Sequence, residues 1–135
     1  MIKQVKRFIV VFCLILAFSA SVSVFAETTM QVVIYTTEYQ QESNILNCSN
    51  YIDFDGVNSI YSTNNLYVEL YEKGSLFNTN IVSLKLVPGT GWMAGTWYSI
   101  LASYNLGASN VPLFIKLDPE GLISGCYGGG RLIDL

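Results

Sequence analysis

Two stretches in the middle of the chain alternate regularly between apolar and polar side chains. The apolar members are Leu66, Val68 and Leu70 in the first stretch, and Val82, Leu84 and Leu86 in the second. Alternation with a period of two gives a β-strand one apolar face and one polar face. Because only a short segment with a turn at Lys73-Gly74 separates the two stretches, the sequence predicts two antiparallel neighbouring strands that share one core face.

Most of the remaining sequence after the N-terminus has the same character. Further runs that are typical of strands lie at 30–39, 51–54, 96–104, 111–117 and 131–135. Turn segments separate the runs, at Asp55-Gly56, Pro88–Gly91, Asn105–Gly107 and Asp118–Gly121. Short strands joined by such turns, without a sustained helical period, favour an all-β fold. We predict a small antiparallel β-sandwich of about seven strands.

The N-terminus has the pattern of an export signal. Three basic residues precede an apolar run at 8–18, and small residues lead up to Ala26. We predict a secretory signal peptide over residues 1–26 and a secreted β-sandwich domain over 27–135. An uncleaved anchor is the alternative, but the apolar run is shorter than the roughly 20 residues that cross a bilayer. We therefore expect an extracellular protein without stable membrane insertion after cleavage.

Removal of the signal peptide would leave an acidic domain. The predicted signal peptide contains three of the seven basic residues and none of the ten acidic ones, so the net charge would fall from −3 to −6. Nucleic acids and anionic lipid surfaces bind proteins with clustered Lys and Arg. The charge therefore argues against both as partners.

Two cysteines, Cys48 and Cys126, lie outside the predicted signal peptide. In an exported chain such a pair most simply forms one disulfide, which we predict, with free thiols or an intermolecular bridge as alternatives. Cys126 lies in the segment SGCYGGGR, residues 124–131. A phosphate-binding loop would need a helix after its glycines, and residues 131–135 are too few to form one. We interpret Gly128–Gly130 as a tight turn that sends residues 131–135 along the sheet edge.

The sequence contains no histidine, which removes the usual serine and cysteine triads and the imidazole metal ligands. A glycosidase could still use two carboxylates. The candidates are Asp53, Asp55, Glu69, Glu72, Asp118 and Glu120. These acids fall at turns or at outward strand positions, where solvated charges are expected, and a hairpin turn is favoured over a calcium site at Asp53–Gly56. We expect no catalytic residues, cofactor or metal; a hydrolase acting through Glu69 or Asp53 is the least favoured hypothesis.

Aromatic residues are the most suggestive feature for function. The residues concerned are Tyr67, Glu69 and Tyr71 on the outward face of one predicted strand, Trp92 in the next loop and Trp97 beyond it. Rings beside carboxylates can stack on sugars or form a protein contact, although tyrosine is also a common cross-strand residue. The first hypothesis is an exported, non-enzymatic module that binds a glycan or a surface protein through this aromatic face. The alternative is a secreted toxin, a bacteriocin-like effector that acts on a competitor's cell envelope.

Overall fold

The computed structural model describes residues 28–93, 96–97, 102–121 and 123–135. The predicted signal peptide, residues 1–26, and part of the predicted strand at 96–104 lie outside the described residues. The strands are β1 Thr28–Ile34, β2 Gln41–Glu42, β3 Leu46–Cys48, β4 Tyr51–Asn58, β5 Leu66–Glu72, β6 Thr79–Leu86, β7 Trp92–Met93, β8 Thr96–Trp97, β9 Ala102–Asn105, β10 Val111–Pro119 and β11 Gly128–Asp134.

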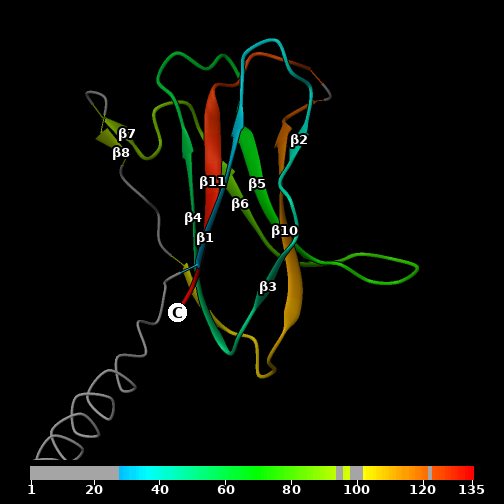
Figure 1. Ribbon diagram of the computed structural model, residues 1–135. Coiled ribbons are helices and arrows are strands. Elements are labelled where there is room, and N and C mark those ends of the chain that lie inside the picture. Colours follow the sequence, from blue (N-terminus) through cyan, green and yellow to red (C-terminus); the bar gives the residue numbers. More distant parts are fainter. Residues whose placement is uncertain (1–27, 94–95, 98–101, 122) are drawn as a thin grey trace, which may run out of the picture.

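Two antiparallel sheets form the body of the protein (Figure 1). One sheet has the strand order β1-β11-β4-β9, and the other has the order β2-β10-β5-β6, with β3 also pairing with β10. Strands β7 and β8 pair only with each other. The described residues contain no helix, so the prediction of an all-β fold with two antiparallel sheets is confirmed.

The predicted pairing of the two alternating stretches is also confirmed. Strands β5 and β6 are antiparallel neighbours, and the ladder places Leu66 opposite Leu86 and Val68 opposite Leu84. Leu66, Val68 and Leu70 are fully buried in the core. The period of two therefore identified the buried face of β5 from sequence alone.

Two glycines that face the core allow the sheets to approach each other. Gly56 of β4 and Gly130 of β11 lie opposite each other in the ladder. A Cβ atom at Gly130 would lie 2.8 Å from Val68 Cγ1 and 2.9 Å from Ile115 Cγ2. A Cβ atom at Gly56 would lie 2.9 Å from Val68 Cγ2. The glycine pair therefore leaves the space that Val68 of the opposite sheet fills.

This packing overturns two turn predictions. Residues 128–130 do not form a turn but begin β11, which lies between β1 and β4 inside its sheet rather than at the edge. Asp55-Gly56 lies within β4 and is not a turn either. The glycines are needed for their missing side chains and not for a special backbone angle, since positive φ occurs instead at Gly89, Gly91, Gly107, Gly121 and Gly125. Four of those five glycines lie in turns that the sequence predicted, although β10 extends to Pro119 and only Glu120-Gly121 form the last turn.

Asp55 was expected to be a solvated turn residue, and that expectation is wrong. Its side chain is only 1% exposed, and its ladder partner is Arg131. The Arg131 Nε and Nη2 groups donate hydrogen bonds to Asp55 Oδ2, at 3.0 and 2.5 Å. A cross-strand arginine thus offsets the cost of burying this carboxylate.

The predicted disulfide between Cys48 and Cys126 is not formed; both are buried free thiols. Cys48 lies opposite Val111, at the start of β10. Cys126 Sγ lies 3.3 Å from the carbonyl oxygen of Asn64, close to the start of β5 and so to the opposite end of β10. The length of β10 separates the two positions by roughly 25 Å, whereas a disulfide needs Cα atoms within about 7 Å. Sequence position could not show that the two thiols lie at opposite ends of the sheet.

Burial also makes both thiols unreactive. It raises the pKa of Cys126, and burial together with the charge of Asp134 raises the pKa of Cys48 to about 12. In a Cys13→Ser variant, we expect iodoacetamide to label neither Cys48 nor Cys126 in the native protein at neutral pH, and both after denaturation without any reductant. The folded state holds Cys48 as the neutral thiol up to a higher pH than the unfolded state does. The free energy of unfolding is therefore unaffected by this group below pH 9.0, and it falls as the pH rises toward 12. Intact mass spectrometry of the iodoacetamide-treated protein tests the labelling prediction, and a product that accepts the label only after reduction would contradict the free thiols.

Candidate functional site

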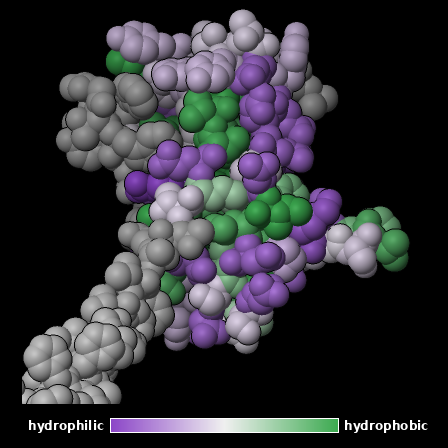
Figure 2. All heavy atoms as spheres, viewed as in Figure 1, coloured by the Kyte–Doolittle hydropathy of each residue, from purple (hydrophilic) through white to green (hydrophobic). Residues whose placement is uncertain are grey.

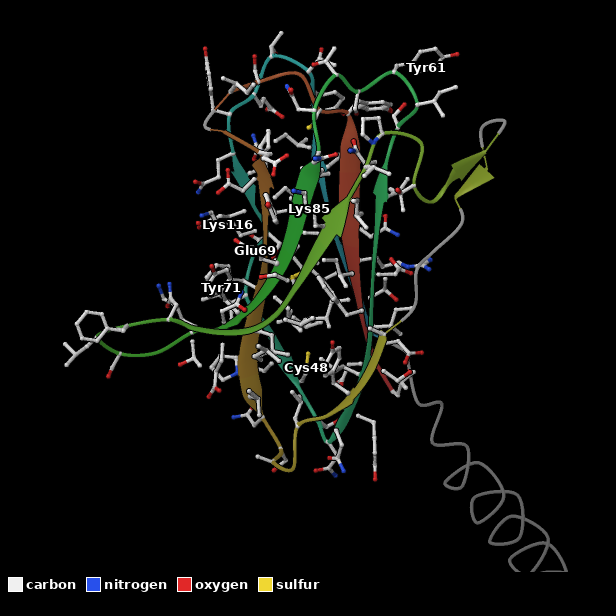
Figure 3. All side chains as sticks on the ribbon, turned by 180° about the vertical axis from the view of Figure 1, so that it is seen from behind. Cys48, Tyr61, Glu69, Tyr71, Lys85 and Lys116 are labelled. Carbon is white, nitrogen blue, oxygen red and sulfur yellow. The ribbon has the colours of Figure 1, made fainter. Side chains whose placement is uncertain are left out.

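Three of the five predicted site residues lie together on one surface. Tyr67, Glu69 and Tyr71 alternate with the buried residues of β5 and so point away from the core. The ladder places side chains of β10 and β6 beside them, and we call the whole set the outer face: Tyr67, Glu69, Tyr71, Asn80, Ser83, Lys85, Phe114, Lys116 and Asp118. Figure 3 shows Glu69, Tyr71, Lys85 and Lys116 gathered over these three strands.

Glu69 lies at the centre of the outer face and is held by two hydroxyl groups. Tyr71 Oη donates to Glu69 Oε2 at 3.2 Å, and Ser83 Oγ donates to Glu69 Oε1 at 3.1 Å. Burial and the negative charge of Glu69 raise the pKa of Tyr71, which keeps the hydroxyl protonated as a donor. Lys116, opposite Glu69 in the ladder, pairs with Asp118 at 3.2 Å. Burial alone would lower the pKa of Lys116, but the hydrogen bond and charge of Asp118 outweigh it and raise the pKa.

A second polar cluster lies around Glu120, beyond the end of β10. Lys85 Nζ lies 2.5 Å from Glu120 Oε1, and Tyr67 Oη donates to the same oxygen at 3.1 Å. Asn65 Nδ2 donates to Glu120 Oε2 at 2.6 Å. The hydrogen bonds from Lys85 and Asn65 lower the pKa of Glu120. A general acid near neutral pH needs a raised pKa instead, so this carboxylate is suited to binding rather than to proton donation.

The rings of the outer face already have partners within the chain. Tyr71 stacks on Phe114 with ring centroids 5.5 Å apart and an interplanar angle of 17°. Lys85 Nζ lies 5.5 Å from the centroid of the Tyr67 ring. One face of each tyrosine ring is therefore in contact with a neighbouring side chain, which leaves less open ring surface than the sequence suggested.

A pocket of about 340 Å³ adjoins the Tyr71–Phe114 stack. It is lined by Glu42, Ser43, Asn44, Ile45, Lys73, Asn78 and Phe114. The Phe114 side chain is 5% exposed, and Lys73 Nζ lies 6.0 Å from the centroid of its ring. The pocket thus combines an aromatic ring and an aliphatic side chain with amides, a carboxylate and an ammonium group.

Sequence reasoning missed this pocket. Residues 42–45 run from the last residue of β2 to the residue before β3, and both strands pair with β10. Nothing in the composition of residues 40–50 predicts that pairing, and Phe114 lies about 70 residues further along the chain. Only the sheet topology brings the pocket residues together.

The other two predicted site residues lie elsewhere. The backbones of Trp92 and Trp97 pair with each other in the β7–β8 hairpin. Figure 1 shows this hairpin outside the two sheets, on the side away from β10. The fold therefore does not place these two positions within the outer face.

Among the residues that the structure describes, five of the six candidate carboxylates contact a neighbouring side chain: Asp53, Asp55, Glu69, Asp118 and Glu120. Ser103 Oγ donates to Asp53 Oδ1, and Arg131 holds Asp55. Within the described ranges, no group of three or more His, Cys, Asp or Glu side chains is placed to hold a metal ion. The same part of the chain includes no helix with the length and hydropathy needed to cross a bilayer.

No known protein family matches the sequence, and no curated protein is similar to it. Among solved structures, the fold is similar to the crystal structure of the Yersinia pseudotuberculosis-derived mitogen. The two share 11% sequence identity over 81% of this chain and 85% of the mitogen chain, with a TM-score of 0.46. A similarity at this level implies no shared function.

Proposed function

We propose that the protein is an exported, non-enzymatic module that binds a glycan at the pocket beside the Tyr71–Phe114 stack. The lining of the pocket carries this proposal. Sugars present apolar C–H faces together with many hydroxyl groups, so they bind where rings lie beside amides and carboxylates. The pocket supplies the exposed Ile45 and the small accessible part of Phe114 for the first kind of contact, and Asn44, Asn78 and Glu42 for the second.

The outer face supports binding over catalysis. Glu69 accepts hydrogen bonds from two hydroxyl groups, and Glu120 has a lowered pKa because of Lys85 and Asn65. Charges held in this way offer a fixed pattern of donors and acceptors to a ligand. The lowered pKa of Glu120 is the opposite of what a proton donor near neutral pH needs. A longer glycan would extend from the pocket along β5 over Tyr71, Glu69 and Tyr67, which keeps all three predicted residues of this strand in the proposed site.

The proposal predicts which tyrosine matters most. We expect Tyr71→Ala to weaken glycan binding by about tenfold or more, because it removes the ring that supports Phe114 beside the pocket. Asn78→Ala should have a similar effect. Tyr61→Ala is the matched control, since Tyr61 is 77% exposed and lies in the β4–β5 loop, away from the outer face.

The measurement is binding of the purified protein and its variants to a printed glycan array, followed by titration calorimetry with the strongest glycan. Unchanged unfolding temperatures would show that the variants fold normally. Absence of binding to any glycan, or equal binding by the Tyr71→Ala variant, would contradict the proposal. Growth inhibition of competing cells by the purified protein, without glycan binding, would favour the toxin hypothesis. Release of shorter sugars that is lost in Glu69→Gln would favour a hydrolase.

A further inference from the structure

The loop between β5 and β6 projects from the body of the protein (Figure 1). The ladder between these strands closes at the pair Glu72 and Thr79, and we call the residues beyond it, 73–78, the arm. Leu76 and Phe77 lie in the arm and are 86% and 85% exposed. In Figure 2 the end of the projecting loop is apolar and stands apart from the body of the protein.

The arm has a defined conformation at its base. The backbone N–H of Lys73 donates to the carbonyl oxygen of Pro112 at 2.8 Å, which fixes the arm to β10. Gly74 is required beyond this point, because a Cβ atom there would lie 1.9 Å from the carbonyl oxygen of Phe77. The chain thus folds back closely on itself and holds the apolar pair away from the sheets.

The exposure of Leu76 and Phe77 favours a lipid bilayer over a protein surface as the partner of the tip. Leu76 and Phe77 are neighbours in sequence, and each is exposed over most of its surface. A flat protein surface would cover one side of such a tip. A lipid bilayer surrounds an inserted tip on every side, and it favours apolar groups at the boundary between head groups and acyl chains.

The charge of the arm agrees with a lipid environment. Lys73, at the base, is the only charged residue between Glu72 and Lys85, although the whole chain has a net charge of −3. Uncharged polar residues, Ser75 and Asn78, flank the apolar pair. The tip can therefore enter the head-group layer without burying a carboxylate, while Lys73 remains at the depth of the lipid phosphates. We propose that the arm docks the protein on a membrane by inserting Leu76 and Phe77 into the head-group boundary of the bilayer.

A fluorescent label beside the tip tests this insertion directly. Ser75→Cys, labelled with a nitrobenzoxadiazole fluorophore, should show a blue shift and a stronger emission when phosphatidylcholine vesicles are added. In a Cys13→Ser background the label would go to this position, because the remaining cysteines, Cys48 and Cys126, are buried. Ser109→Cys, labelled in the same way in the loop between β9 and β10, should show no change. A signal at the Ser75 position without one at the Ser109 position distinguishes insertion of the arm from attachment through residues 1–27.

Removal of the apolar pair gives the second readout. We expect Leu76→Ser with Phe77→Ser to lower the partition of the labelled protein into these vesicles by at least about 100-fold, because two apolar side chains no longer leave water. The matched control is Ile60→Ser with Tyr61→Ser, which removes another adjacent exposed pair and should leave the partition unchanged.

An unchanged spectrum at Ser75→Cys, or equal partition of the Leu76→Ser, Phe77→Ser variant, would overturn the proposal. So would a shift from dimer to monomer in that variant without any effect on vesicle binding, which would identify a second copy of the chain as the occupant. Glycan binding on an array requires no lipid, so failure here is distinguishable from failure of the proposed glycan site.

Discussion

Replacing Gly130 by valine is expected to destabilise the protein by about 3 kcal/mol or more, as overpacking does in a dense core. A Cβ atom at this position would already lie 2.8 Å from Val68 and 2.9 Å from Ile115, and both of these side chains are fully buried in the opposite sheet. Neither can move without displacing other core residues. Urea denaturation followed by tryptophan fluorescence measures the change in the free energy of unfolding.

Two further variants show whether sheet separation is the cause. Gly130→Ala should also lower the free energy of unfolding. Adding Val68→Ala to that variant should recover part of the loss, since it removes the atoms closest to the new Cβ. Gly107→Ala should cost only about 1 kcal/mol, because open space surrounds Gly107 and only its φ of 65° disfavours a side chain. A Gly130→Val variant as stable as the wild type would show that the sheets are not packed against this glycine.

Replacing Arg131 by methionine is the second change with a large expected effect. It removes the hydrogen-bond donors to Asp55 Oδ2 and leaves a carboxylate that is 1% exposed. The other oxygen of this carboxylate, Oδ1, has no hydrogen-bond partner in the described part of the chain. Breaking a buried ion pair costs about 3–5 kcal/mol. Because Arg131 is partly exposed, we expect the free energy of unfolding to fall by about 3 kcal/mol.

The double variant distinguishes a buried charge from lost packing. Asp55→Asn combined with Arg131→Met should be more stable than Arg131→Met alone, because the unpaired charge is gone. Thermal unfolding of the wild type, both single variants and the double variant gives the coupling energy between the two residues. A coupling energy near zero would mean that the ion pair contributes nothing to stability.

The all-β class and one strand pairing could be predicted from the sequence. The alternation in Leu66–Glu72 and Thr79–Leu86 identified two strands, their pairing and the buried side of β5. The predicted outward stripe of Tyr67, Glu69 and Tyr71 lies on one face for the same reason. Boundaries were less accurate: β1 ends at Ile34, where the sequence suggested Tyr39, because Glu38 and Tyr35 form a turn through backbone and side-chain hydrogen bonds.

The candidate site could be predicted only in part. The stripe on β5 follows from a local pattern, but the pocket beside it depends on residues 42–45 lying next to Phe114. Trp92 and Trp97, predicted as ligand contacts beyond this strand, lie in a separate hairpin whose strands pair with each other.

Sequence alone therefore determined where most of the longer strands lie and which side of β5 is apolar, since both depend on neighbours one or two residues away. The tertiary structure decided everything that depends on distant partners. It placed Cys48 and Cys126 at opposite ends of a sheet, and it put Arg131 beside Asp55 across 76 residues of chain. It also turned Gly130 from an expected turn residue into a packing position. The physical reason is that strand register and sheet stacking bring together residues whose separation along the chain carries no signal of their contact.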